Sequence, residues 1–246
     1  TPKANKDFIL ERDSRVKEFK ADKEFNSISK KWREYALKKK YMNNFSWLGR
    51  PLIQFPGDVM AIQELISTIK PNKIIETGIA HGGSLILSSS IMYLNDIKNS
   101  QVIGVDIDIR SHNREALDNH PLRFKMDLFE GPSTDPSIVD DIRSSAASYD
   151  SVLLSLDSNH THDHVLAELN AYGDLVTLGS YCIVFDTVIE RLPSGLYTDR
   201  PWDVGDNPMT ACRQWLKTHP EFSIDQSINN RLQISVAPDG YLKRIS

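Results

Sequence analysis

Acidic residues that close short apolar runs are the first sign of chemistry in this sequence. Four runs of branched apolar residues each end on a carboxylate, and these acids are Glu76, Asp106, Asp157 and Asp186. If the runs are parallel strands, their carboxyl ends share one edge of a sheet, which is where open α/β proteins bind ligands. One acid at a strand end is common, whereas four at equivalent places predict a functional site.

A turn containing glycines follows the first of these acids. Residues 76–84 read Glu-Thr-Gly-Ile-Ala-His-Gly-Gly-Ser, a spacing that differs from the dinucleotide pattern G-x-G-x-x-G. Glycines let backbone N–H groups approach a ligand without obstruction by Cβ. The carboxylate of Glu76 would repel a pyrophosphate but suits a cationic ligand. S-adenosylmethionine fits, since it has a sulfonium, an ammonium and no phosphate, and Asp106 would accept its ribose hydroxyls. His81 would either contact the cofactor or cap the next helix.

The densest group of ligand-type residues is Asp-Ser-Asn-His-Thr-His-Asp-His at 157–164. One interpretation is a zinc hydrolase, although the run is one residue shorter than the H-x-H-x-D-H pattern. Another is a polar helix N-terminus, which suits residues 162–164. We favour a third interpretation for the other residues. Asp157 would bind a hard divalent cation together with Asp186, and His160 would act as general base on a substrate hydroxyl.

Alternating strands and helices would position these residues. Strands are predicted at 73–76, 101–105, 122–126, 151–156 and 181–185, and helices at 58–70 (capped by Asp58), 85–94, 137–147, 162–178 and 208–218. This order predicts an α/β fold with a Rossmann-like, doubly wound and mostly parallel sheet. Residues 222–225 and 232–236 leave no room for a helix between them, so we expect an antiparallel hairpin at one edge of the sheet.

Charge divides the chain into two parts. Residues 1–40 contain 13 Lys/Arg and 7 Asp/Glu, whereas the remaining 206 residues contain 16 and 26. Apolar residues recur at helical spacing over 7–40. We therefore expect a basic helical extension at 1–45 and a catalytic domain at 46–246. The extension would be a solvated helix, or would contact an acidic subunit, an anionic substrate or a membrane surface.

Composition excludes several classes of protein. The 246 residues are 40% hydrophobic and 25% charged, as in ordinary globular proteins. Their net charge of −4 gives no indication of a charged partner, and we expect none that is a nucleic acid. There is no apolar run of about 18 residues, which a transmembrane helix would need. The charged first ten residues lack the apolar region of a signal peptide. Two cysteines exclude a disulfide framework and a four-thiolate zinc site. We expect a cytoplasmic protein.

Several motifs run in order from residue 47 to residue 244. They are Trp47-Leu48-Gly49-Arg50-Pro51, Gln54-Phe55-Pro56-Gly57-Asp58, Lys70-Pro71, Glu76-Thr77-Gly78, His81-Gly82-Gly83-Ser84, Gly104-Val105-Asp106-Ile107-Asp108, Leu156-Asp157-Ser158-Asn159-His160, Gly179-Ser180-Tyr181 and Pro238-Asp239-Gly240-Tyr241-Leu242. Together they resemble the cephalosporin hydroxylase / rhamnosyl O-methyltransferase family. The resemblance implies a class I S-adenosylmethionine-dependent methyltransferase. Such an enzyme would methylate a hydroxyl of a sugar or natural product with Mg²⁺, in natural-product biosynthesis or polysaccharide modification.

The resemblance also implies roles for individual residues. The cofactor would be held by Glu76, Gly78, His81, Gly82, Gly83, Ser84, Asp106 and Asp157, with Gly131 and Ser133 near its adenine. Asp157 and His160 would be catalytic, and Asp157 and Asp186 would bind the metal. We expect a small-molecule or glycosyl acceptor and a homo-oligomer.

One position departs from the family pattern. Related sequences tend to have two adjacent acids where this chain has Phe185-Asp186, so one expected metal ligand is missing. The site would then be completed by His160 or water, bind the metal more weakly, or hold none. A second hypothesis follows from this loss, namely a cofactor-binding scaffold that supports a partner enzyme without turnover.

Overall fold

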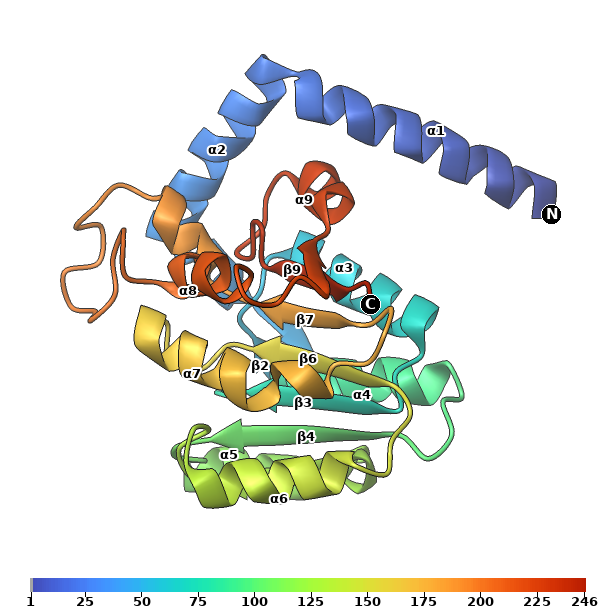
Figure 1. The fold of residues 1–246 in the computed structure, drawn as a ribbon, viewed down its shortest axis with the longest axis vertical. Coiled ribbons are helices and arrows are strands. Elements are labelled where there is room, and N and C mark those ends of the chain that lie inside the picture. The colour runs from blue at the N-terminus through green and yellow to red at the C-terminus, as the bar shows by residue number, and fades with distance from the viewer. Residues whose placement is uncertain (1) are drawn as a thin grey trace.

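A seven-stranded sheet forms the centre of the computed structural model, which describes residues 2–246 (Figure 1). Its strand order is β5-β4-β3-β6-β7-β9-β8. The strands are β3 (Lys73–Thr77), β4 (Gln101–Asp106), β5 (Met126–Glu130), β6 (Val152–Leu156), β7 (Tyr181–Val184), β8 (Phe222–Ile224) and β9 (Tyr241–Arg244). The first five are mutually parallel, and β9 is antiparallel to both β7 and β8. The predicted mostly parallel sheet with an antiparallel edge is therefore confirmed.

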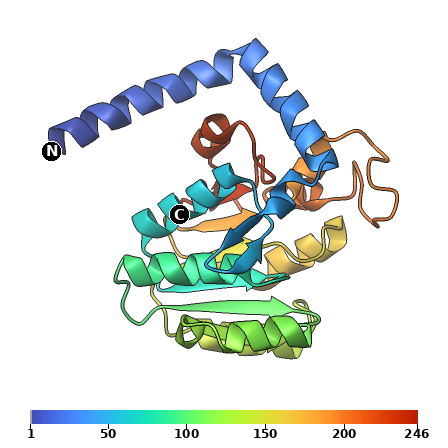
Figure 2. The ribbon, with the colours of Figure 1, turned by 180° about the vertical axis from the view of Figure 1, so that it is seen from behind.

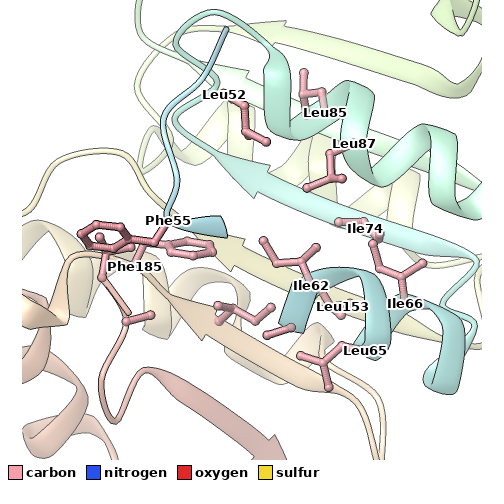
Figure 3. Packing of buried hydrophobic residues seen from close by; sticks show 14 of the residues in the cluster. Leu52, Phe55, Ile62, Leu65, Ile66, Ile74, Leu85, Leu87, Leu153 and Phe185 are labelled. Atoms are coloured by element: carbon pink, nitrogen blue, oxygen red, sulfur yellow. The ribbon is translucent and has the colours of Figure 1, made fainter. Parts of the chain in front are cut away.

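Helices cover both faces of the sheet, so its strands are apolar on both sides. One face carries α3 (Pro56–Ile69), α4 (Gly83–Leu94) and α5 (Ser111–Asp118), and the other α6 (Pro136–Ala146), α7 (His162–Tyr172) and α8 (Pro208–Trp215). Successive strand residues alternate between the two cores: Ile74 and Leu153 pack in the first, Ile75 and Leu154 in the second. Figure 3 shows Ile74 and Leu153 facing α3 in the first core.

The basic extension is two helices where the sequence predicted one. Helix α1 (Pro2–Ala21) ends before Asp22, whose carboxylate accepts a hydrogen bond from Phe25 N at 2.9 Å and thereby caps α2 (Lys23–Lys38). Figures 1 and 2 show α1 running along the outside of the molecule above α9, and α2 turning back toward the sheet. The end of α2 buries Ala36 and Leu37 in the first core.

Residues 41–55, which connect α2 to α3, contain regular structure. A short 3₁₀ helix, η1 (Tyr41–Asn44), leads into an antiparallel hairpin of β1 (Phe45–Trp47) and β2 (Arg50–Leu52). Its turn residues Leu48 and Gly49 both have positive φ angles, as tight hairpin turns require. Trp47 Nε1 donates to Ser90 Oγ of α4 at 2.9 Å, which fixes the hairpin on the first core.

Two predicted strands are wrong in position. The segment 122–126 is mostly a 3₁₀ turn, η2 (Arg123–Lys125), and β5 begins only at Met126, which pairs with Val102. At the C-terminal edge, the expectation that no helix fits between residues 225 and 232 is wrong: α9 (Gln226–Leu232) fills this gap, and Asp225 caps it by accepting from Ser227 N. No strand forms at 232–236. The partner of β8 is instead β9.

Two helix ends also differ from prediction. Helix α7 stops at Tyr172 rather than 178 and continues as η3 (Gly173–Leu175). A Cβ on Gly173 would lie 2.5 Å from the Trp215 ring, so α8 packs against the chain at this point. Helix α3 begins at Pro56, which places Asp58 inside its first turn and not at its cap.

Asp58 instead joins α3 to the C-terminal segment. Its fully buried carboxylate accepts hydrogen bonds from Ser235 Oγ at 2.6 Å, Val236 N at 2.9 Å and Tyr241 Oη at 2.8 Å. Burial raises the pKa of Asp58 to about 6.

An Asp58→Ala variant is expected to lose about 2 to 4 kcal/mol of unfolding free energy, because three buried donors lose their acceptor. Urea denaturation at pH 7.5 measures this loss. Glu64→Ala, which removes a partly exposed carboxylate from the same helix, is the control. A loss no larger than that of the control would contradict a role for Asp58 in joining these segments.

Within the described residues, no helix combines the length and apolar character that crossing a bilayer requires.

Candidate active site

The strand order changes direction between β3 and β6, at the edge of the sheet where the strand-end acids lie. Such a switch point is the usual ligand site of a doubly wound sheet. A cavity of about 260 Å³ opens there. It is lined by predicted site residues from three strand ends, namely Gly78, His81, Gly83, Ser84, Asp157, His160 and Asp186.

Asp157, His160 and Asp186 form the polar centre of this cavity. His160 Nδ1 lies 3.1 Å from Asp186 Oδ2, and His160 Nε2 lies 3.8 Å from Asp157 Oδ1. One ligand atom from each of the three side chains lies within 4.8 Å of the others. Among residues 2–246, no lysine or arginine forms an ion pair with either carboxylate. Burial, and then the charge of Asp186, raises the pKa of Asp157 well above its ordinary value. A bound cation would relieve this repulsion.

Gln54 also lines the cavity. From the sequence, we named it only as part of the Gln54–Asp58 motif and gave it no role in the site. It is buried, and its Nε2 donates to Asp157 Oδ2 at 3.3 Å. Its Oε1 has no hydrogen-bond partner in the described part of the chain, although it is buried. Gln54 therefore orients Asp157 and offers a further oxygen beside the carboxylates.

Trp202 is a second residue of the site that the sequence analysis above does not include. Its ring stacks on the imidazole of His160, with centroids 5.7 Å apart and an interplanar angle of 20°. Tyr197 contacts the Trp202 ring edge-on at 5.3 Å. Asp203 holds their loop by accepting from Ser194 Oγ and Gly195 N. The imidazole thus lies beside Asp186 and is covered on one face by Trp202, although its buried Nδ1 forms no hydrogen bond among the described residues.

A Trp202→Ala variant is expected to lower kcat by up to about tenfold, the effect of losing one aromatic pair. KM should change less, because Trp202 acts through His160. Steady-state kinetics measures both constants. Trp202→Phe retains a ring and should keep most of the activity, and equal losses in the two variants would contradict the positioning role.

The glycines of the turn serve chain packing in addition to any ligand. Gly78 has φ +79°, and a Cβ there would lie 2.1 Å from the carbonyl oxygen of Asp157. A Cβ on Gly83 would lie 2.2 Å from the carbonyl oxygen of Pro51. We predicted that these glycines serve ligand approach only. In the structure, their lack of a side chain also allows the turn to pack closely against the end of β6 and against the β1–β2 hairpin.

Asp106 fixes the same turn. Its Oδ2 accepts hydrogen bonds from Ile79 N at 2.9 Å and Ala80 N at 3.1 Å. This contact shapes the rim of the cavity. The contact of Asp106 with ribose hydroxyls stays a prediction.

Glu76 lies beneath the turn and does not line the main cavity. It is 3% exposed and accepts a hydrogen bond from Ser84 Oγ. Burial, and to a smaller extent the charge of Asp106, raises the pKa of Glu76 to about 7 against the effect of this hydrogen bond. Glu76 lines a separate internal space of about 20 Å³ that Gln54 and Asp157 also border.

Gly131 and Ser133 likewise lie outside the lining of the main cavity. Ser133 is buried, and its Oγ donates to Glu168 Oε1 at 2.5 Å. Ser158 Oγ donates to the same oxygen at 2.7 Å. Sequence reasoning missed Glu168, whose only signal is an acid four residues after His164 on a helix. Glu168 thereby links Ser133, which follows β5, to Ser158, which follows Asp157. The contact of Gly131 and Ser133 with the adenine of the cofactor stays a prediction.

The histidine run does not form a zinc site. His162 contacts Thr210 Oγ1 at 2.8 Å and Gln214 Oε1 at 3.1 Å, both on α8. His164 contacts Glu168 at 3.3 Å. Of the three histidines, His160 alone reaches the metal-type cluster found among residues 2–246. The run is therefore a helix start that contributes one histidine, His160, to the candidate site.

A family model described as Rhamnosyl O-methyltransferase/CmcI matches residues 39–245. The chain belongs to this family. Proteins named rhamnosyl O-methyltransferase from Mycobacterium bovis and Mycobacterium leprae are each 29% identical to it, over 214 and 221 residues. These alignments cover 83% and 89% of this chain, and 82% and 91% of the relatives.

Solved structures of CmcI share the fold. One is described with Mg and SAM, the other as an apo-structure, and their TM-scores are 0.59 and 0.58 at 20% identity. Each alignment covers 83% of this chain, and 78% or 77% of the CmcI chain. The predicted Rossmann-like methyltransferase fold is confirmed.

Proposed function

We propose that this chain is an S-adenosylmethionine-dependent O-methyltransferase that acts on a sugar or natural-product hydroxyl with a divalent cation. The observation that carries this proposal is the convergence of Asp157, His160 and Asp186 in one cavity beside the glycine turn. Family membership and relatives named rhamnosyl O-methyltransferase support the reaction class. The CmcI structure described with Mg and SAM supports the two cofactors.

The donor set fits a hard cation. Asp157 and Asp186 supply carboxylate oxygens, and Gln54, whose Nε2 donates to Asp157, has an amide oxygen without a hydrogen-bond partner among the described residues. Phe185, which replaces the second expected acid, is 3% exposed and packs in the core, so it offers no ligand. A bound Mg²⁺ would orient the acceptor oxygen and lower its pKa.

His160 is the general base in this proposal. Asp186 lies 3.1 Å from Nδ1 and would stabilise the imidazolium, while Nε2 lies beside Asp157 and would take the proton from the acceptor hydroxyl. S-adenosylmethionine would supply the methyl group. Methyl transfer is an in-line displacement, in which the acceptor oxygen approaches the methyl carbon opposite the departing sulfur. Most of the catalysis would therefore come from positioning the acceptor hydroxyl, with His160 beside it to take the proton.

The homo-oligomer and the cytoplasmic location belong to this proposal as well. Helix α1 exposes Phe8, Ile9 and Leu10 by 59%, 44% and 61%, on an extension whose charge is opposite to that of the rest of the chain. A second copy would cover this surface. The free, buried thiols of Cys182 and Cys212 fit a reducing compartment.

Removing residues 1–21 is expected to reduce the assembly size, because it deletes α1 while leaving α2 in the core. Affinity for S-adenosylmethionine should stay within about twofold, a change of less than 0.5 kcal/mol. Light scattering coupled to size exclusion measures the mass of the assembly. An unchanged mass would contradict the role of α1.

Release of S-adenosylhomocysteine from S-adenosylmethionine tests the proposed function. Rhamnosides, other deoxysugar glycosides and phenols serve as acceptors, with Mg²⁺ or with EDTA. We expect turnover with a sugar acceptor and its loss with EDTA. No transfer with any acceptor or metal would favour the scaffold hypothesis, for which Phe185 is the motivating observation.

A further inference from the structure

A second polar cavity lies away from the strand ends, between α2, α9 and the segment 233–239. Its volume is about 180 Å³, and it shares no lining residue with the active-site cavity. Three cationic side chains line it: Lys30 and Arg33 from α2, and Arg191 at the end of η4 (Thr187–Arg191). The side of α2 that faces the protein body therefore brings positive charge to this cavity.

Arg33 is the unusual member of this group. It is 6% exposed, yet it makes one long hydrogen bond, from Nη1 to Gln233 O at 3.4 Å. Its Nε is buried without a partner among the described residues. No carboxylate in that part of the chain lies within ion-pair distance of its guanidinium. Burial lowers the pKa of Arg33, and the charge of Arg191 lowers it further.

Asp239, the one carboxylate that lines the cavity, does not pair with Arg33. Asp239 accepts hydrogen bonds from Arg191, from Asn229 Nδ2 at 2.6 Å and from Gln226 Nε2 at 3.3 Å. Lys30 is 62% exposed, and its ammonium lies 3.9 Å from Glu34. Arg33 therefore has no ion-pair partner among the described residues, although the charges of Glu34 and Asp58 offset part of the effect of burial on its pKa. A buried guanidinium whose Nε donor has no acceptor is costly unless an anion accepts from it.

We propose that this cavity binds a phosphate-type oxyanion, held by Arg33 and Arg191 with Lys30 at its entrance. Guanidinium groups match the oxygen spacing of phosphate and bind it in a bidentate manner. The side-chain amides of Asn230 and Gln233, which also line the cavity, would supply further donors. The anion would be inorganic phosphate or the terminal phosphate of a nucleotide.

Thermal shift with sodium phosphate, against sodium chloride at matched ionic strength, tests this proposal. The wild-type melting temperature should rise with phosphate concentration. In Arg33→Met the phosphate response should fall at least tenfold in apparent affinity. Lys31→Met removes the same charge from an exposed position on the same helix and should respond as wild type does. Uridine diphosphate, as a second ligand, separates the two sources of the anion.

Stability without phosphate provides the second readout. Arg33→Met should be as stable as wild type or more stable in chloride buffer, because it removes an unpaired buried charge. Arg191→Met should also weaken the phosphate response. No phosphate response in wild type, or an equal response in Arg33→Met, would overturn the proposal. If Arg33→Met is less stable and the wild-type protein does not respond to phosphate, the proposal is likewise overturned, and Arg33 serves only to bind Gln233 O. Neither result bears on methyl transfer, because the two cavities are separate.

Discussion

Replacing His160 with alanine is expected to lower kcat by about 10²- to 10⁴-fold, the usual contribution of a general base. Nε2 would be the atom that removes the acceptor proton, and no other imidazole lies in the metal-type cluster found among residues 2–246. Affinity for S-adenosylmethionine should stay within a few-fold, because His160 faces the acceptor. Steady-state kinetics and calorimetric titration of the cofactor measure the two effects.

His162→Ala is the matched control for this variant. His162 belongs to the same run of histidines, but its ring contacts Thr210 and Gln214 on α8. It should retain kcat close to that of wild type. Full activity in His160→Ala, or equal losses in both variants, would remove His160 from the role of base.

Glu76→Gln is expected to change how stability depends on pH. The pKa of Glu76 is about 7 in the fold, because its carboxyl group is buried, against an ordinary value of 4.5. The native protein therefore keeps a proton that the unfolded chain releases. The resulting stabilisation is complete below pH 4.5 and is lost as pH rises to 7. It amounts to about 3 kcal/mol for this one group.

Glutamine resembles the protonated acid, so the variant should lack this loss. Urea denaturation of wild type and Glu76→Gln from pH 5 to pH 8, without cofactor, measures the difference. A cationic ligand would favour the ionised carboxylate, so the wild-type affinity for S-adenosylmethionine should rise through pH 7 and that of Glu76→Gln should not. Parallel stability curves for the two proteins would contradict the buried, protonated state of Glu76.

The strands that carry the site were predictable from the sequence, because their pattern is local. β3, β4, β6 and β7 lie within about one residue of the predicted bounds, since each is a short apolar run that stops at an acid. β9 was not predictable, because the strand after α9 is selected by pairing with β7 and not by its own pattern. Asp58 was misplaced for a similar reason, since its partner Ser235 is 177 residues away.

The site was only partly predictable from the sequence. Asp157, His160 and Asp186 come together because parallel strands end at one edge. Gln54 and Trp202 reach the same place from segments whose path depends on tertiary packing, and residue type alone does not reveal that path. Glu76 and Ser133 are buried behind the cavity, since their own hydrogen bonds to Ser84 and Glu168 hold them there.

The most direct test of the proposed catalytic centre is the anomalous scattering of Mn²⁺ in crystals grown with S-adenosylhomocysteine. We expect one strong peak between the carboxylates of Asp157 and Asp186, with the sulfur of the product facing the same cavity as His160. A peak at another position, or the product bound away from the glycine turn at Gly78, would contradict the account.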